Sequence, residues 1–233
     1  MKKIDLLKKS IIILLTVATV FFVGWLCDDE YFLGSFTLCF GLVQVTLMLK
    51  GSWTAELLAL IECFVSCFIY WTNGLFGTII FSIIVYIPLG IYNVFSWKKS
   101  QNADGVVKIN KFSKKMSIMV IAGIIFSTAI ITTLLSFIPT QNYSVLDALT
   151  NMLNIAGVVL IGFRFKEGWY CWIVCNVVEC VTWILMIIGG APNSIMMLII
   201  CLVYIVLDVF GIKAFVKMRN NQEKSNSQIE AKI

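Results

Sequence analysis

Five aromatic and polar residues share one face of a predicted helix and form the clearest candidate for a binding site. Their spacing of i, i+3, i+7, i+10 and i+14 places on that face Trp169, Trp172, Asn176, Glu179 and Trp183. The rest of the helix is apolar, and a carboxylate or carboxamide at membrane depth usually faces a cavity because lipid cannot solvate it. Indole rings attract cations. This face therefore predicts a cavity that binds a flat, cationic small molecule.

The helix that carries this face is one of many apolar runs. The chain is 60% apolar and 13% charged, unlike a soluble domain. Eight runs reach or approach the length that crosses a bilayer, and they cover residues 10–27, 31–49, 54–72, 75–97, 116–138, 145–165, 169–188 and 193–216. We expect an all-α, polytopic membrane protein with a single transmembrane domain over residues 1–217 and a disordered cytoplasmic tail over 218–233.

The positive charges indicate how the chain lies in the membrane. All 18 Lys and Arg residues precede the first run or follow the second, fourth, sixth and eighth runs, which places them on one side. The first connection on the other side is acidic, with Asp28, Asp29 and Glu30. The positive-inside rule then puts both termini in the cytoplasm of a cell-membrane protein. The net charge of +5 reflects this topology and does not indicate a nucleic-acid partner.

The two ends of the chain resemble each other at an offset of 116 to 118 residues. The matching stretches are 50–53 with 166–169, 62–63 with 179–180, and 85–89 with 203–207. Each match is short, but their order and nearly constant offset favour an internal repeat. The repeat predicts two parallel three-helix units joined by a linker helix, with one extra helix at the N-terminus. The units cover 31–97 and 145–216, the linker 116–138 and the extra helix 10–27.

A repeat of this kind pairs the two mid-helix glutamates, Glu62 and Glu179. Transporters commonly place the substrate at the interface between repeats, near the middle of the membrane. We therefore expect both carboxylates to face a shared cavity, with Asn151 and Asn154 as further candidates because they lie one helical turn apart. The alternative is that these polar side chains only bond to neighbouring helices.

The residues that most enzymes and cofactor sites need are missing. The chain has no histidine, no phosphate-binding G-x-x-x-x-G-K-[ST] loop and no H-E-x-x-H motif. Its eight cysteines include no C-x-x-C pair, so we interpret them as small apolar residues in helices. We expect no catalytic residues, no metal and no cofactor. An intramembrane enzyme that uses Glu62 and Glu179 as an acid–base pair is the remaining enzymatic alternative.

Residues 167–176, with the sequence EGWYCWIVCN, resemble the W-x-x-W-x-x-x-N pattern of the PnuC family of vitamin transporters. The resemblance covers about residues 31–217. It implies a three-plus-one-plus-three helix arrangement like that of SWEET sugar transporters, and an assembly that is often trimeric. It also implies facilitated diffusion of nicotinamide riboside, followed by phosphorylation in the cytoplasm that traps the vitamin. By this resemblance Trp169, Trp172 and Asn176 contact the ligand.

The residues leave several functions open. Nicotinamide riboside and thiamin both carry an aromatic cation, so an indole-lined cavity with carboxylates suits either vitamin. A substrate-binding subunit with a separate ATP-driven partner and a sensor that does not transport are further alternatives. The expected partners are the small-molecule substrate, membrane lipid and other copies of the chain.

Overall fold

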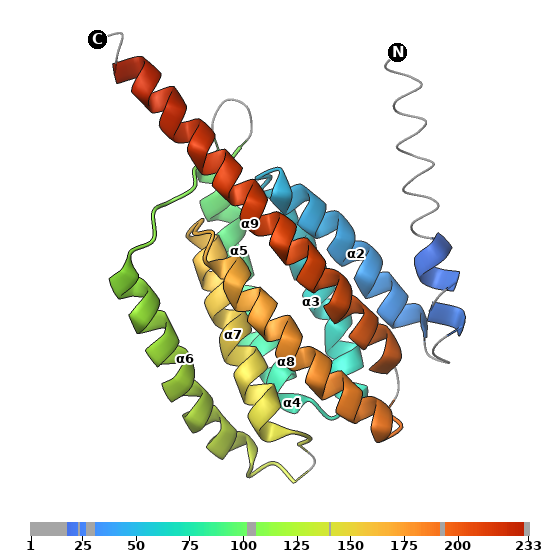
Figure 1. The fold of residues 1–233 in the computed structure, drawn as a ribbon. Coiled ribbons are helices and arrows are strands. Elements are labelled where there is room, and N and C mark those ends of the chain that lie inside the picture. The colour runs from blue at the N-terminus through green and yellow to red at the C-terminus, as the bar shows by residue number, and fades with distance from the viewer. Residues whose placement is uncertain are drawn as a thin grey trace.

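A computed structural model describes residues 18–22, 24–26, 31–101, 106–139, 141–191 and 194–230 (Figure 1). The described residues are helical apart from turns, connections and one isolated bridge between Gln101 and Val107. The elements are α2 (Tyr31–Leu49), α3 (Thr54–Thr72), α4 (Phe76–Phe81), η1 (Ser82–Tyr86), α5 (Ile87–Lys99), α6 (Lys114–Leu135), α7 (Ser144–Gly162), α8 (Gly168–Ile188) and α9 (Ser194–Glu230). The prediction of an all-α protein is thus confirmed for this part of the chain.

Six stretches of the described chain are long and apolar enough to cross a membrane. They are 54–72, 76–99, 114–135, 144–162, 168–188 and 194–224, and a shorter apolar helix covers 34–49. Six predicted runs match these helices with bounds that differ by three residues or fewer, and the last run is longer than predicted. The predicted run 10–27 lies mostly outside the described residues, which include helical segments at 18–22 and 24–26.

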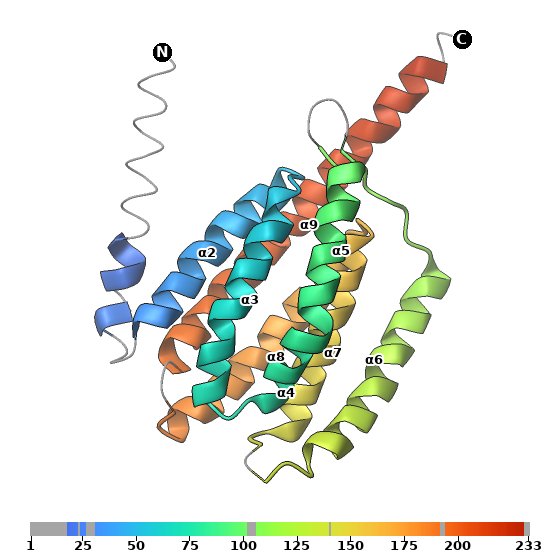
Figure 2. The same cartoon turned by 180° about the vertical axis from the view of Figure 1, so that it is seen from behind.

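Six helices form a closed ring around a common interior. In ring order they are α2, α3, α5, α7, α8 and α9, and each packs against the next, with α9 packing back against α2. Helix α6 lies outside the ring and packs against α7, so it stands at the edge of the molecule in both views (Figures 1 and 2). Helices α3 and α8, which carry Glu62 and Glu179, therefore lie opposite each other in the ring.

The fourth predicted run is broken by a π-helical turn. This turn, η1, lies between α4 and α5 and ends two residues before Pro88. Proline has no N–H to donate and its ring displaces the carbonyl four residues earlier, so the regular hydrogen-bond pattern cannot continue. The Ser82 hydroxyl donates to the Thr78 carbonyl oxygen at 2.8 Å on the N-terminal side of the break. Pro88 therefore accounts for this irregular turn, and the side chains of Ser82 and Tyr86 in the turn face the interior of the ring.

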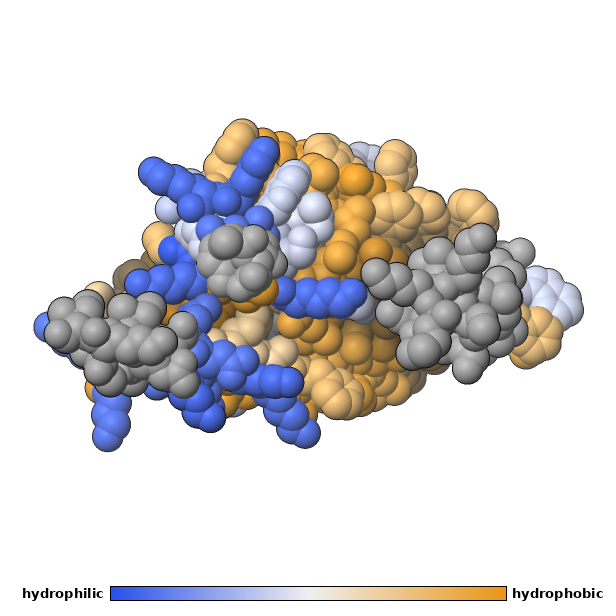
Figure 3. Space-filling view, turned by 90° about the horizontal axis from the view of Figure 1, so that it is seen from above, coloured by the Kyte–Doolittle hydropathy of each residue, from blue (hydrophilic) through white to orange (hydrophobic). Residues whose placement is uncertain are grey.

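Two clusters of buried apolar side chains lie at the two ends of the ring. The distal cluster contains Leu38, Ile69, Leu75, Trp183, Met186, Met196, Met197, Ile200 and Cys201. The basic-end cluster contains Val45, Met48, Ala55, Trp97, Val107, Ile109, Ile161, Trp169 and Phe215. In the view from above, hydrophilic side chains gather over one half of this end of the molecule, and apolar side chains fill much of the other half (Figure 3).

A short extended segment, residues 106–110, crosses the basic end and is called the strap here. Val107 and Ile109 are 0% and 4% exposed and pack into the basic-end cluster. Gln222 of α9 holds both, because its side-chain amide donates to the Val107 carbonyl oxygen at 3.0 Å and accepts from the Ile109 amide at 3.0 Å. Arg164 Nε, from the α7–α8 connection, donates to a strap carbonyl at 3.1 Å. The strap thus joins α9 to the α7–α8 connection.

The C-terminal segment differs from its prediction. Helix α9 continues to Glu230, where we expected a disordered tail over 218–233. Two contacts extend the helix: Gln222 binds the strap, and Arg219 Nε pairs with Glu223 Oε1 at 3.2 Å, one helical turn away. Composition alone could not reveal these contacts, because the partner of Gln222 is more than 100 residues away in the sequence.

Replacing Gln222 with alanine should loosen the strap. The variant loses both side-chain bonds to the strap, and a neutral hydrogen bond contributes about 1 kcal/mol. We expect the amide of Ile109 to exchange its hydrogen about 3- to 10-fold faster, as measured by hydrogen–deuterium exchange with mass spectrometry. Asn221→Ala is the matched control because Asn221 is exposed and adjacent. Equal exchange rates in the two variants would contradict the assigned role of Gln222.

Candidate substrate-binding cavity

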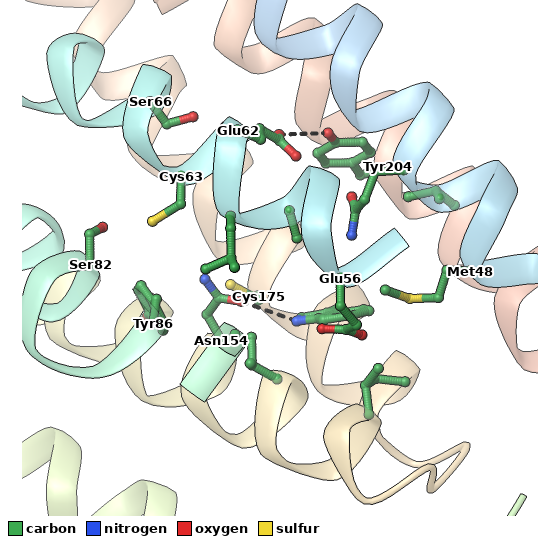
Figure 4. A pocket seen from close by; sticks show the side chains of 18 of the residues that line it. Met48, Glu56, Glu62, Cys63, Ser66, Ser82, Tyr86, Asn154, Cys175 and Tyr204 are labelled. Carbon is green, nitrogen blue, oxygen red and sulfur yellow. Dashed lines mark hydrogen bonds between the residues drawn. The ribbon is translucent and has the colours of Figure 1, made fainter. Parts of the chain in front are cut away.

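A cavity of about 240 Å³ occupies the interior of the ring between the two apolar clusters (Figure 4). On α9 the distal cluster contributes residues 196–201, the cavity Tyr204 and Asp208, and the basic-end cluster Phe215. Helix α8 shows the same order in reverse, from Trp169 to Met186. The cavity therefore lies near the middle of the membrane-spanning region, with apolar side chains beyond each end.

The charged groups that line the cavity are all acidic. Within the described residues the lining includes the carboxylates of Glu56, Glu62, Glu179 and Asp208, and it includes no Lys or Arg. The chain has no histidine. Charged groups in a membrane interior are costly unless they are paired or hydrogen-bonded. The cavity is thus suited to a ligand that brings positive charge and hydrogen-bond donors.

Two of these carboxylates accept strong hydrogen bonds from the opposite half of the ring or from a neighbouring helix. The Tyr204 hydroxyl of α9 donates to Glu62 Oε1 of α3 at 3.0 Å (Figure 4). Asn176 Nδ2 of α8 donates to Asp208 Oδ2 of α9 at 2.9 Å. Each bond engages one oxygen of the carboxylate, and the second oxygen can accept a hydrogen bond from a ligand in the cavity.

The other two carboxylates have weaker support. Glu179 accepts from two thiols, Cys175 Sγ at 3.8 Å and Cys201 Sγ at 3.3 Å, and thiols are weak donors. Glu56 lies in the first turn of α3, is 4% exposed, and has one oxygen, Oε1, with no hydrogen-bond partner in the described part of the chain. These two groups retain the most capacity to bind a ligand.

The aromatic wall of the cavity is Trp172 on α8. Its Nε1 donates to Asn154 Oδ1 of α7 at 3.1 Å (Figure 4). The indole reaches this position because Gly157 has no side chain: a Cβ there would overlap the ring at Nε1 and Cδ1. An indole face beside several carboxylates is a site that attracts an aromatic cation.

Five of the predicted site residues come together in this cavity. They are Glu62, Asn154, Trp172, Asn176 and Glu179. The middle of the predicted α8 face therefore lines this cavity, and Glu62 lines it from α3, the helix opposite α8 in the ring.

Trp169 and Trp183, the two ends of the predicted face, lie outside the cavity. A separation of 14 residues spans about 21 Å along a helix, which is longer than the part of α8 that lines the cavity. Trp169 is 0% exposed, and its ring packs edge-on against Trp172 and Phe215, with centroid distances of 5.2 and 5.5 Å. Trp183 is 1% exposed and belongs to the distal cluster. Helical spacing defines the direction in which the two side chains project, but it does not show how far along α8 the cavity extends.

Asn151 also lies outside the cavity lining, in contrast to the prediction. Its Nδ2 donates to Asp147 Oδ1 at 2.7 Å and to Thr78 Oγ1 at 3.1 Å, and its Oδ1 accepts from the Tyr86 hydroxyl at 3.0 Å. These bonds use the amide fully and join α7 to α4 and η1. Asp147, which is 2% exposed, is the centre of this network, and its role was not predicted from the sequence.

Two further carboxylates of the cavity, Glu56 and Asp208, were not predicted as cavity residues from the sequence. Glu56 and Glu62 are six residues apart and project about 120° from each other on a helix, so a search for one polar face cannot find both. The available signal was simpler: each is a carboxylate inside a membrane-length apolar run, which by itself indicates an interior position.

Replacing Asn151 with alanine should destabilise the protein more than replacing Asn154. Asn151→Ala removes a donor from the buried Asp147 carboxylate, and such a charge-assisted bond contributes about 1.5–3 kcal/mol. Asn154→Ala removes one bond to an indole. Thermal unfolding of the purified variants in detergent should show the larger drop in Tm for Asn151→Ala. A larger drop for Asn154→Ala would contradict the assignment of Asn151 to a structural network.

Comparisons with known proteins agree with this arrangement. The sequence model of the nicotinamide mononucleotide transporter family matches residues 31–217. The nicotinamide riboside transporter PnuC of Neisseria mucosa is 24% identical over 193 residues, covering 79% of this chain and 72% of that protein. PnuC of Haemophilus influenzae is 26% identical over 148 residues, covering 61% and 64%.

A solved structure has the same fold. The crystal structure of the vitamin B3 transporter PnuC superposes with a TM-score of 0.76 at 21% identity, over 91% of this chain and 92% of that one. The family match covers the six-helix ring, α6 and every cavity-lining residue named above. The chain therefore belongs to the nicotinamide mononucleotide transporter family, the family of the PnuC transporters.

Proposed function

We propose that this chain transports nicotinamide riboside across the cell membrane by facilitated diffusion, with phosphorylation in the cytoplasm trapping the vitamin. The observation that carries the proposal is the cavity itself, in which an indole and four carboxylates surround a space without a basic side chain among its described lining residues. The pyridinium ring of nicotinamide riboside is a flat cation. A good cation–π contact contributes about 0.5–2 kcal/mol, and the carboxylates supply the opposite charge.

The charge of the cavity favours the riboside over the mononucleotide for which the family is named. A phosphate group adds nearly two negative charges at neutral pH. Four carboxylates, with no Lys or Arg beside them in the described lining, would repel it. The two curated relatives, both called nicotinamide riboside transporters, support the same choice. Thiamin is the second candidate, because it also carries an aromatic cation.

In this proposal the substrate lies between α8 and α3. Trp172 stacks on the ring, Asn176 and Asn154 bind its polar substituents, and Glu179 and Glu62 balance its charge. The support is that all five residues line one cavity, while the apolar clusters beyond each end provide surfaces that can separate it from both aqueous sides.

The proposal includes two parallel repeats in a three-plus-one-plus-three arrangement like that of SWEET transporters. If α2, α3 and α5 correspond to α7, α8 and α9, the ring contacts map onto themselves: α2–α3 onto α7–α8, α3–α5 onto α8–α9, and α5–α7 onto α9–α2. Helix α6 is the linker. The predicted helix over 10–27 would be an eighth, outside the repeat.

We also propose one transmembrane domain over residues 1–217, both termini in the cytoplasm, and a homo-oligomer, with the trimer as the expected form. The support for the orientation is that all Lys and Arg residues lie in the N-terminal segment or in alternate connections and the C-terminal segment. The support for assembly is the family resemblance together with α6, where many apolar side chains are exposed outside the ring.

Alanine in place of Trp172 or Asn176 should reduce uptake of nicotinamide riboside at least about 10-fold, because each removes a direct ligand contact. Uptake of labelled substrate into proteoliposomes measures this. Trp71→Ala is the matched control, since Trp71 also lies on a ring helix but is 65% exposed on the outer surface. Unchanged uptake by both cavity variants would contradict the assigned site.

Purified protein alone should equilibrate nicotinamide riboside across liposomes without ATP. Excess nicotinamide riboside should compete with the labelled substrate, whereas the mononucleotide should not. A requirement for ATP and a second protein would instead indicate a binding subunit, and ligand binding without flux would indicate a sensor. More effective competition by thiamin than by nicotinamide riboside would reassign the substrate.

A further inference from the structure

One buried carboxylate oxygen of the cavity, Glu56 Oε1, has no hydrogen-bond partner among the described residues. Glu62, Glu179 and Asp208 each accept at least one hydrogen bond from a described side chain. Glu56 is 4% exposed, as Asp208 is, and its carboxylate interacts with the Asn93 side chain, but its Oε1 has no hydrogen-bond partner in the described chain. An unpartnered acceptor in a region of low dielectric costs free energy. A ligand that donates a hydrogen bond there removes that cost.

The position of Glu56 is defined by the basic-end cluster and by the ring. Its neighbour Ala55 belongs to that cluster, and Trp172 packs against the same cluster from α8. Helices α3 and α8 are opposite each other in the ring, so Glu56 and Trp172 lie on facing walls at a similar depth. Figure 4 shows the Glu56 carboxylate among the side chains that line the cavity.

The chemistry of Glu56 suits hydroxyl groups better than a second cationic group. The substrate carries a single positive charge, and three other carboxylates in the same cavity can balance it. An ionised carboxylate only accepts hydrogen bonds and has two oxygens for doing so. The carboxamide of the substrate needs both a donor and an acceptor, which Asn154 and Asn176 beside Trp172 offer. The ribose hydroxyls need acceptors.

We propose that Glu56 binds the vicinal hydroxyl groups of the ribose and is thereby the residue that selects a riboside over the free vitamin ring. The inference rests on the proposed function and adds a specificity-determining contact to it. Carboxylates recognise ribose hydroxyls in the same way in dinucleotide-binding proteins. With the ring stacked on Trp172, the sugar extends toward α3.

The test compares two ligands that share the cationic ring and the carboxamide but differ in the sugar. The ligands are nicotinamide riboside and N1-methylnicotinamide, and the measurement is the Kd of each for the wild-type protein and for Glu56→Gln. We expect Glu56→Gln to weaken the riboside about 10- to 100-fold, the range for a charge-assisted hydrogen bond. The Kd of N1-methylnicotinamide should change less than about 3-fold.

The matched control is Glu62→Gln, which alters a cavity carboxylate assigned to the charge of the ring and should weaken both ligands. Equal weakening of both ligands by Glu56→Gln would overturn the inference, because it would make Glu56 another counter-charge. No weakening of either would overturn it as well. If the wild-type protein binds neither ligand, the proposed function fails, and the inference fails with it.

A change in the ligand tests the same contact without changing the protein. The 2′,3′-dideoxy analogue of nicotinamide riboside should bind the wild-type protein at least about 10-fold more weakly than the riboside. This measurement decides the matter if Glu56→Gln does not fold. Equal affinity for the riboside and its dideoxy analogue would overturn the inference.

Discussion

The cost of placing carboxylates inside a membrane shapes this protein. Four such groups line one cavity, and each must find donors from the protein or from a ligand. A single helix cannot supply them, so the chain closes six helices into a ring in which α3, α8 and α9 contribute the acids and several of their donors. Buried apolar clusters at the two ends of the ring then limit the polar region to the middle.

Much of this fold follows from hydropathy. Helices that cross a membrane must be long and continuously apolar, so the bounds of most helices could be predicted closely. The end of α9 could not, because residues 218–230 are mostly polar and the contact between Gln222 and the strap joins segments far apart in sequence. The π-helical turn before Pro88 has a local cause, because proline has no N–H to donate and interrupts the regular hydrogen bonds of a helix.

The cavity was less predictable than the helices. Periodicity identified the direction in which Trp172, Asn176 and Glu179 project, but depth along the axis depends on where neighbouring helices cross. Trp169 therefore packs against Phe215 of α9 and Trp183 against the distal cluster. Asn151 is hydrogen-bonded to Asp147, Thr78 and Tyr86, which come from both halves of the chain. The spacing of residues in the sequence cannot predict which side chains from distant segments will contact each other.

Gly157 has a consequence for how related proteins diverge. Its missing side chain lets the Trp172 indole lie against α7, and any larger residue would push the ring into the cavity and reduce its volume. A single substitution at a packing position can thus change the size of the accepted cargo without altering one polar contact. Selectivity in this architecture can therefore change through Gly157, a residue that packs behind Trp172 and does not line the cavity.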